Sequence, residues 1–175
     1  MNKMDVKRWL QEYCYPETFC DYCKSCPNYD KVWSCPPGVP TAKGFLGKYT
    51  QVITIAVKVI YSKEDQPSGS TAEMIEKLRQ DTYGKVKRIL YEILLYIEKE
   101  NPGTLLLGAG RCEQCENCSR LQDLPCKKPE KMRYSLTAFG FDFIKLVKEL
   151  FDQELLWSQS DLPEYNLAVT ALLIP

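Results

Sequence analysis

The sequence carries two groups of cysteines whose spacing is typical of metal centres. In the second group, two-residue gaps separate three cysteines and a fourth follows at a distance: Cys112, Cys115, Cys118 and Cys126. Such gaps let successive thiolates bend around one object, and the distant thiolate closes the cage. The first group has nearly the same spacing and consists of Cys20, Cys23, Cys26 and Cys35. We therefore predict that all eight cysteines bind metal.

The available donor atoms restrict the choice of metal. The chain has nine cysteines and no histidine, so any metal must be held mainly by sulfur. All-thiolate sites favour zinc or iron–sulfur clusters. We favour [4Fe-4S] clusters, because zinc ribbons pair two C-x2-C knuckles whereas a tight triad suits the corners of a cube. Two closed structural zinc sites remain the alternative.

The number of clusters stays open at this level. The simplest assignment gives each group of four cysteines its own cluster. A single cluster built from both groups is the chief rival, since two-cluster ferredoxins exchange a ligand between runs. Cys14, the ninth cysteine, is interpreted as a small buried apolar residue and not as a ligand.

Composition predicts one globular domain over residues 1–175. The chain is 45% hydrophobic and 26% charged, as in ordinary globular proteins. Its 23 basic and 23 acidic residues cancel, which gives no argument for nucleic acid or for a membrane surface as partner. No apolar run approaches the roughly 18 residues of a membrane-spanning helix, and the first residues do not resemble a secretory signal. We expect a cytoplasmic protein, in whose reducing surroundings clustered cysteines favour metal over disulfides.

The segments between the cysteines predict the scaffold. β-branched residues predict a strand over 51–61, and an apolar stripe predicts one long helix that ends at Asn101. Its start is predicted by a capping box over 70–73, and Gly84 marks a bend. A short buried strand over 104–107 follows the helix.

The two ends of the chain add further elements. The pattern predicts a short amphipathic helix over 4–13, one or two helices over 132–151 broken near Gly140, and a last strand over 165–174. A strand–helix–strand unit usually forms a parallel pair with a right-handed crossover. We therefore predict an α+β or small α/β fold. It has a small mixed sheet of about three strands, with the long helix and the C-terminal helices packed on it.

Two cysteine-rich loops, over 14–40 and 108–130, are expected at one edge of this sheet. Five prolines and glycines after Cys26 argue against regular structure in the first loop. Tyr29 and Trp33 are expected to shield it from water. Charges of both signs surround the second loop and are interpreted as a solvated surface: Arg111, Arg120, Lys127, Lys128, Lys131 and Arg133, with Glu113, Glu116, Asp123 and Glu130. Gly108 and Gly110 either approach a cluster with their backbone N–H groups or serve turn geometry.

Residues around these cysteines resemble a known family. The resemblance is carried by Tyr29-x3-Trp33-x-Cys35-Pro36-Pro37, Gly110-Arg111-Cys112-x2-Cys115-x2-Cys118, Pro125-Cys126-x2-Pro129, Arg133-Tyr134-Ser135, Ala138-x-Gly140 and Asp142. The chain is similar over most of its length to a cysteine-rich family of predicted metal-binding proteins of bacteria and archaea. The resemblance implies metal binding through these cysteines and no settled reaction. Asp30 stands where the pattern leads us to expect glycine.

Two classes of function fit these observations. A small electron-transfer protein with a redox protein as partner is favoured, because fully cysteine-ligated clusters pass electrons without an open site. No nucleophile–base pair or phosphate-binding glycine motif accompanies the cysteines. The alternatives are an enzyme or maturation factor with an open-site cluster, and a binding module with structural zinc. The sequence leaves the oligomeric state and the redox partner undetermined.

Overall fold

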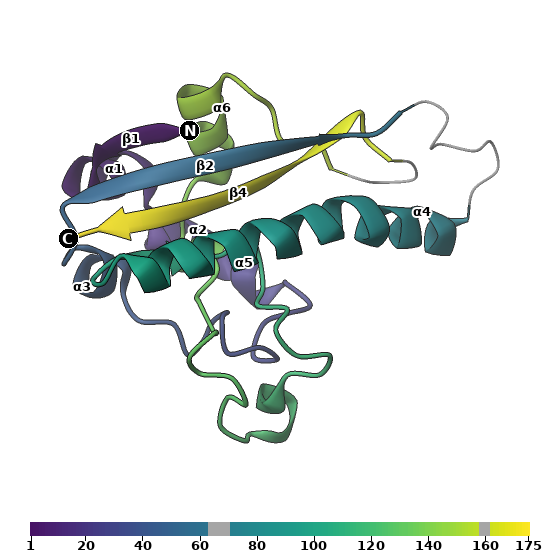
Figure 1. Ribbon diagram of the computed structural model, residues 1–175, viewed down its shortest axis with the longest axis horizontal. Helices are drawn as coiled ribbons and strands as arrows, with labels where there is room; N and C mark the ends of the chain where they lie inside the picture. Colours follow the sequence, from purple (N-terminus) through teal and green to yellow (C-terminus); the bar gives the residue numbers. More distant parts are fainter. Residues whose placement is uncertain (63–70, 158–161) are drawn as a thin grey trace.

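The computed structural model describes residues 1–62, 71–157 and 162–175, and of Cys20 it describes the backbone. Its centre is a four-stranded sheet in the order β1-β2-β4-β3 (Figure 1). The strands are β1 (Asn2–Asp5), β2 (Gln51–Ile60), β3 (Leu105–Leu107) and β4 (Tyr165–Ile174). Every pairing in this order is antiparallel. The predicted α+β class is confirmed.

The sheet differs from the expected one in its pairing. Both β2 and β3 run antiparallel to β4, so they point in the same direction, as predicted for a strand–helix–strand unit. They are not neighbours, because β4 is inserted between them. Eight of the ten residues of β4 are buried, which places the most apolar strand at the centre. The fourth strand, β1, comes from the residues before the first helix.

One long helical rod connects β2 to β3 (Figure 1). It consists of α4 (Ala72–Arg79), the π turn η2 (Gln80–Gly84) and α5 (Lys85–Glu100). The expected bend at Gly84 is thus a π turn. The helix cap is Thr71, whose Oγ1 accepts a hydrogen bond from the backbone N–H of Met74 at 3.3 Å. Ser70, which we expected to begin the capping box, lies outside the described residues.

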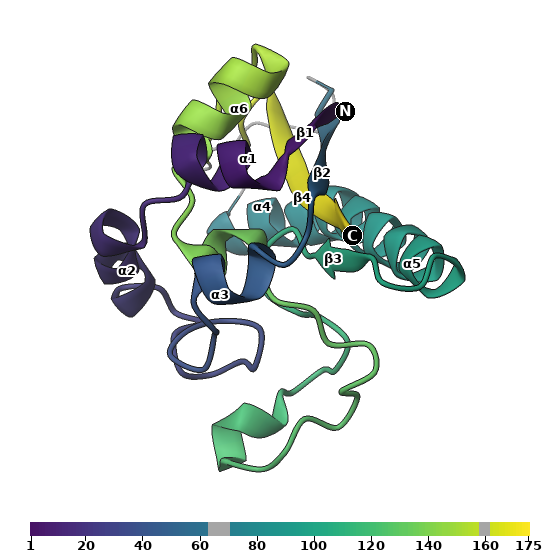
Figure 2. The ribbon, with the colours of Figure 1, turned by 90° about the vertical axis from the view of Figure 1, so that its left-hand side faces the viewer.

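Different helices cover the two faces of the sheet (Figure 2). On one face α1 (Val6–Tyr13) and α6 (Phe143–Phe151) pack in the main core, which includes Leu173 of β4. On the other face Leu94 of α5 packs against Leu106 and Leu172. The adjacent residues Leu172 and Leu173 of β4 thus pack on opposite faces of the sheet, because side chains alternate along a strand. Among the described helices, none has the length and apolar character needed to cross a membrane.

The expected break near Gly140 is confirmed. A 3-10 helix, η4 (Leu136–Phe139), ends there and α6 begins three residues later, with Asp142 as its cap. Gly140 has a φ of +79°, and a Cβ at this position would lie 2.5 Å from the Cα of Pro16. Glycine is required here because both the backbone conformation and the contact exclude a side chain.

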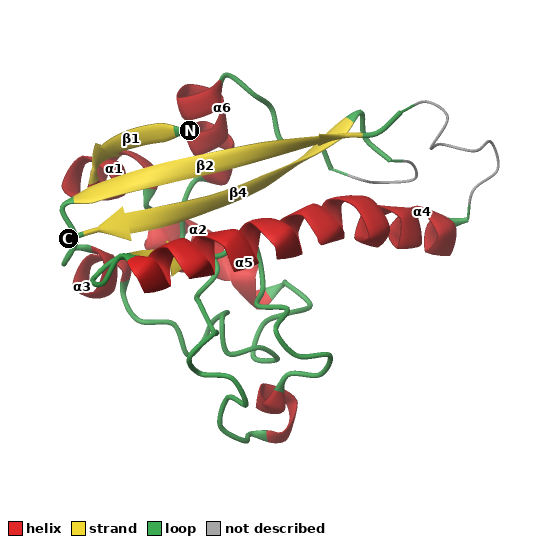
Figure 3. Cartoon of the chain, viewed as in Figure 1, coloured by secondary structure: helices red, strands yellow, loops and turns green. Residues whose placement is uncertain are grey.

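Both cysteine-rich segments extend away from the sheet beyond the β3 side, and most of their length is loop (Figures 2 and 3). The prediction of irregular structure over 14–40 is wrong for α2 (Pro16–Lys24), a two-turn helix with proline in its first turn. Proline is favoured at that position because its missing N–H would be unpaired anyway. The short helices α3 (Ala42–Leu46) and η3 (Ser119–Gln122) flank or interrupt the loops.

Candidate metal centre

The four cysteines of the second segment border one small cavity. Cys112, Cys115, Cys118 and Cys126 all line it, and Trp33 of the first segment lines it as well. All four are free thiols. The segment leaves the sheet at Gly108, which exchanges backbone hydrogen bonds with the returning chain at Tyr134 and Leu136. The chain that enters the segment and the chain that leaves it are therefore hydrogen-bonded to each other where the segment meets the sheet.

Cys112 is difficult to ionise without a cation. Burial raises the pKa of Cys112, and the neighbouring Cys126, Cys115 and Cys118 act in the same direction. A backbone N–H of Gln114 donates to the sulfur and opposes the shift. Metal binding would reverse this balance, because a bound cation favours the thiolate form. The donor chemistry of this group fits a metal centre.

In the first group, Cys23 and Cys26 lie near Cys35. Burial raises the pKa of Cys35 to about 11; Cys26 and Cys23 add to the shift, and Ser34 and Arg111 oppose it. Cys20 and Cys23 lie one turn apart in α2, but the side chain of Cys20 is outside the described part of the chain. Of the three thiols of this group that the structure describes, Cys26 is the exposed one, and it accepts a hydrogen bond from the Asn28 amide at 3.7 Å.

The structure thus brings Cys23, Cys26 and Cys35 into one neighbourhood and the four later cysteines into another. Over residues 1–62, 71–157 and 162–175, no set of three cysteine or carboxylate side chains is arranged to hold a metal ion. Cys14 packs against the main core, and its thiol donates to the Phe139 carbonyl at 3.2 Å. Cys14 is thus partly buried, whereas we expected a buried residue.

Ser34 joins the two groups, and sequence reasoning missed it. It is fully buried between Trp33 and Cys35. Its hydroxyl accepts the backbone N–H of Cys112 at 2.8 Å and lies 3.8 Å from the Cys35 sulfur. Its carbonyl accepts the N–H of Ser135 at 3.0 Å. One side chain therefore contacts a thiol of the first group and the backbone of the second.

Trp33 and Arg120 form a second connection between the segments. The indole N–H of Trp33 donates to the Leu124 carbonyl at 3.2 Å, and the Arg120 guanidinium lies 4.4 Å from the ring centroid. Arg120 also forms an ion pair with Asp30. Asp30 has a φ of +56°, a left-handed conformation that glycine adopts most easily. The aspartate thus keeps the glycine-like turn and adds a charge that holds the second segment.

Two charges that we interpreted as solvated surface are structural. Arg120 pairs with Asp30, as described, and Arg133 pairs with Glu98 of α5 at 2.6 Å. Both side chains of the second pair are largely buried, at 18% and 12% exposure. Glu98 also accepts the backbone N–H of Leu106 at 2.8 Å. This carboxylate therefore ties α5 both to β3 and to the end of the second cysteine segment.

Comparison with known proteins gives one match. The model of a family described as "Predicted metal-binding protein (DUF2284)" matches residues 9–174, nearly the whole chain. Neither the curated proteins nor the solved structures contain a match.

Proposed function

Because the chain belongs to this family of predicted metal-binding proteins, we propose that it binds two [4Fe-4S] clusters and transfers electrons to or from a redox protein. The first cluster is assigned to Cys20, Cys23, Cys26 and Cys35, and the second to Cys112, Cys115, Cys118 and Cys126. When bound, such clusters exchange single electrons, and full thiolate ligation leaves them without an open coordination site.

The observation that carries this proposal is the four-thiol cavity of the second segment. Four cysteines from a stretch of fifteen residues border one space, and a tryptophan from another segment covers part of it. Sulfur-only ligation is the arrangement that iron–sulfur clusters prefer. The separate neighbours of Cys35 and Cys112 support one cluster for each group over a single shared cluster.

Other residues of the chain suit a redox centre. The Gln114 N–H that donates to the Cys112 sulfur, and the Asn28 amide that donates to Cys26, would stabilise negative charge on a reduced site. Trp33 limits the access of water from one side. Arg111 exerts a positive potential on Cys35. The two N–H donors and the Arg111 charge favour the form with the additional electron.

Metal analysis of anoxically purified protein tests the proposal. We expect about eight irons and eight sulfides per chain, a brown colour that dithionite bleaches, and a low-temperature electron paramagnetic resonance signal after reduction. Single Cys→Ser variants at the eight positions then assign the ligands: loss of half of the iron from each variant supports two closed clusters. A colourless protein with stoichiometric zinc would reject the iron–sulfur assignment and support the structural-zinc alternative.

One observation favours a second candidate, an enzyme or maturation factor with an open-site cluster. Cys26 is an exposed thiol, and its hydrogen-bond partner Asn28 lines a large pocket. If Cys26→Ser leaves the iron content unchanged, one iron of the first cluster has a position open to a substrate. An unchanged iron content of Cys26→Ser would thus favour this second function over electron transfer.

A further inference from the structure

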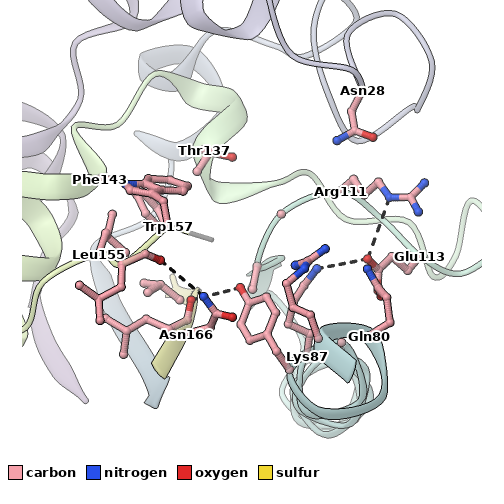
Figure 4. Close-up of a pocket in the computed structure, with 18 of the residues that line it drawn as sticks. Asn28, Gln80, Lys87, Arg111, Glu113, Thr137, Phe143, Leu155, Trp157 and Asn166 are labelled. Carbon is pink, nitrogen blue, oxygen red and sulfur yellow. Dashed lines mark hydrogen bonds and ion pairs between the residues drawn. The ribbon is translucent and has the colours of Figure 1, made fainter. Parts of the chain in front are cut away.

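A large pocket lies beside the cysteine segments. Its volume is about 620 Å³, within the range of small-molecule binding sites. Its walls come from the helical rod around η2, from β4, from the chain around and after α6, from Asn28 of the first cysteine segment and from the start of the second (Figure 4). Elements far apart in sequence therefore enclose one space.

One wall of the pocket is apolar. Figure 4 shows Phe143, Leu155 and Trp157 together on this side. Leu167 and Val169 of β4 contribute to the same pocket. The Trp157 side chain is 72% exposed, although burying an indole is strongly favourable. An apolar or aromatic ligand in the pocket would remove this surface from water.

The opposite wall is charged. Three basic and two acidic residues line the pocket, an excess of one positive charge. Arg79 is held by Glu76 through two hydrogen bonds of 2.7 Å, and Lys87 lies 3.2 Å from Glu113. Arg111 reaches the same Glu113 at 4.0 Å, beyond hydrogen-bonding distance, and is 46% exposed. Of the three basic residues, Arg111 therefore has the weakest pairing with a carboxylate of the pocket, and its positive charge is the least neutralised.

The backbone of the rod changes where it faces the pocket. Gln80, Tyr83 and Gly84 of the π turn all line the cavity. Gly84 is buried, and a Cβ there would lie 2.7 Å from the Gln80 side-chain oxygen. A π turn inserts one residue into a helix at some cost and recurs at functional sites. Its position on this wall is a second reason to assign a ligand to the pocket.

We propose that this pocket binds a small organic monoanion, with an aromatic or apolar body and one carboxylate. The body lies against Phe143, Leu155 and Trp157, and the carboxylate meets the Arg111 guanidinium. A guanidinium recognises a carboxylate through two parallel hydrogen bonds. A single excess positive charge suits one carboxylate, whereas a phosphate would bring close to two negative charges. The site does not depend on which metal the cysteines hold.

Isothermal titration calorimetry on the metal-loaded full chain tests the proposal with naphthylacetate, its neutral amide and naphthylmethylamine. We expect naphthylacetate to bind with a dissociation constant below roughly 1 mM. The amide should bind roughly tenfold more weakly, and the amine should give no heat of binding. Equal binding of acid and amide would overturn the assigned anion, and no binding of any probe would overturn the site.

Three variants locate the binding. Arg111→Gln should weaken naphthylacetate to the level of the amide and leave the amide unchanged. Trp157→Ala should weaken both ligands by the same factor, because it removes the apolar wall. Arg88→Gln is the matched control: this exposed arginine of α5 lies outside the pocket, and binding should not change. Acid binding that survives Arg111→Gln and Trp157→Ala refutes the proposed site. Metal content measured on each sample separates this result from a failure of the metal assignment.

Discussion

The backbone N–H of Cys112 donates a 2.8 Å hydrogen bond to the hydroxyl of Ser34, 78 residues earlier in the chain. The same hydroxyl lies next to the Cys35 sulfur. The two cysteine groups therefore share a buried polar contact at their junction. This contact fixes the position of the first residue of the second triad relative to the first group.

Ser34→Ala should destabilise the protein. The change leaves the Cys112 N–H without its acceptor in a buried place, which typically costs about 1–3 kcal/mol. Urea unfolding of the metal-free protein would measure the loss. Ser25→Ala, at an exposed position, is the control and should have little effect. Equal stability of the two variants would show that water replaces the Ser34 hydroxyl at no cost.

Arg133→Ala should also lower the free energy of unfolding. Its partner Glu98 remains largely buried and loses its charge-paired donor. Because both side chains keep some exposure, we expect a loss of about 1–2 kcal/mol, below the value for a fully buried pair. A double-mutant cycle with Glu98→Gln would isolate the pair, since glutamine still offers an acceptor to the Leu106 N–H. A coupling energy near zero would contradict this role.

Gly140→Ala should be more harmful than Gly38→Ala. Alanine must adopt a positive φ and place its Cβ against the Pro16 backbone. Strain of this kind costs about 1–3 kcal/mol. Gly38→Ala is a matched control, because a Cβ there meets nothing within 4 Å. Thermal unfolding should separate the two variants clearly, and coincident melting curves would refute the predicted strain.

Cys35 should behave as a weakly acidic thiol in the metal-free protein. Burial, followed in effect by Cys26 and Cys23, raises its pKa from 9.0 to about 11. When folding raises the pKa of a thiol, its contribution to stability is fully present at a pH below the pKa of the unfolded state. This contribution is lost as the pH rises through the pKa of the folded state. Stability should therefore fall between pH 9 and about 11, and Cys35→Ala should reduce the slope.

Iodoacetamide alkylation, followed by peptide mass spectrometry, would report this ionisation directly. The alkylation rate of Cys35 should rise with an inflexion near the pKa of about 11. Metal-loaded protein should show no alkylation at Cys35 over the same range, if Cys35 is a ligand. An inflexion near 9, the ordinary value for a thiol, would mean that Cys35 is not buried in solution.

Local sequence patterns predicted strands of the sheet but not which of them pair with each other. The β-branched run of β2 and the apolar run of β4 mark strands, because each pattern follows from the strand itself. The insertion of β4 between β2 and β3 depends on which edge buries most apolar surface, and no local pattern encodes it. For this reason the parallel pair was a wrong expectation while the α+β class was correct.

The two cysteine groups stood out in the sequence, but their supporting residues did not. Cysteine spacing predicts metal-binding segments because the geometry of a metal centre is short-range. Ser34 and Arg120 act through partners 78 and 90 residues away, and a lone serine or arginine in a loop gives no sign of such a contact. The pocket was likewise invisible, since its lining residues lie far apart in the sequence.

The central position of β4 has a consequence for synthesis of the protein. A ribosome makes both cysteine-rich stretches before Tyr165–Ile174. Until that strand is made, β2 and β3 have no strand between them. β3, which leads into the second cysteine segment at Gly108, then lacks its pairing partner. Thiols are thus exposed to the cell on a nascent chain whose sheet is still incomplete. Both cysteine groups therefore gain their finished support only once β4 has been made and has closed the gap between β2 and β3.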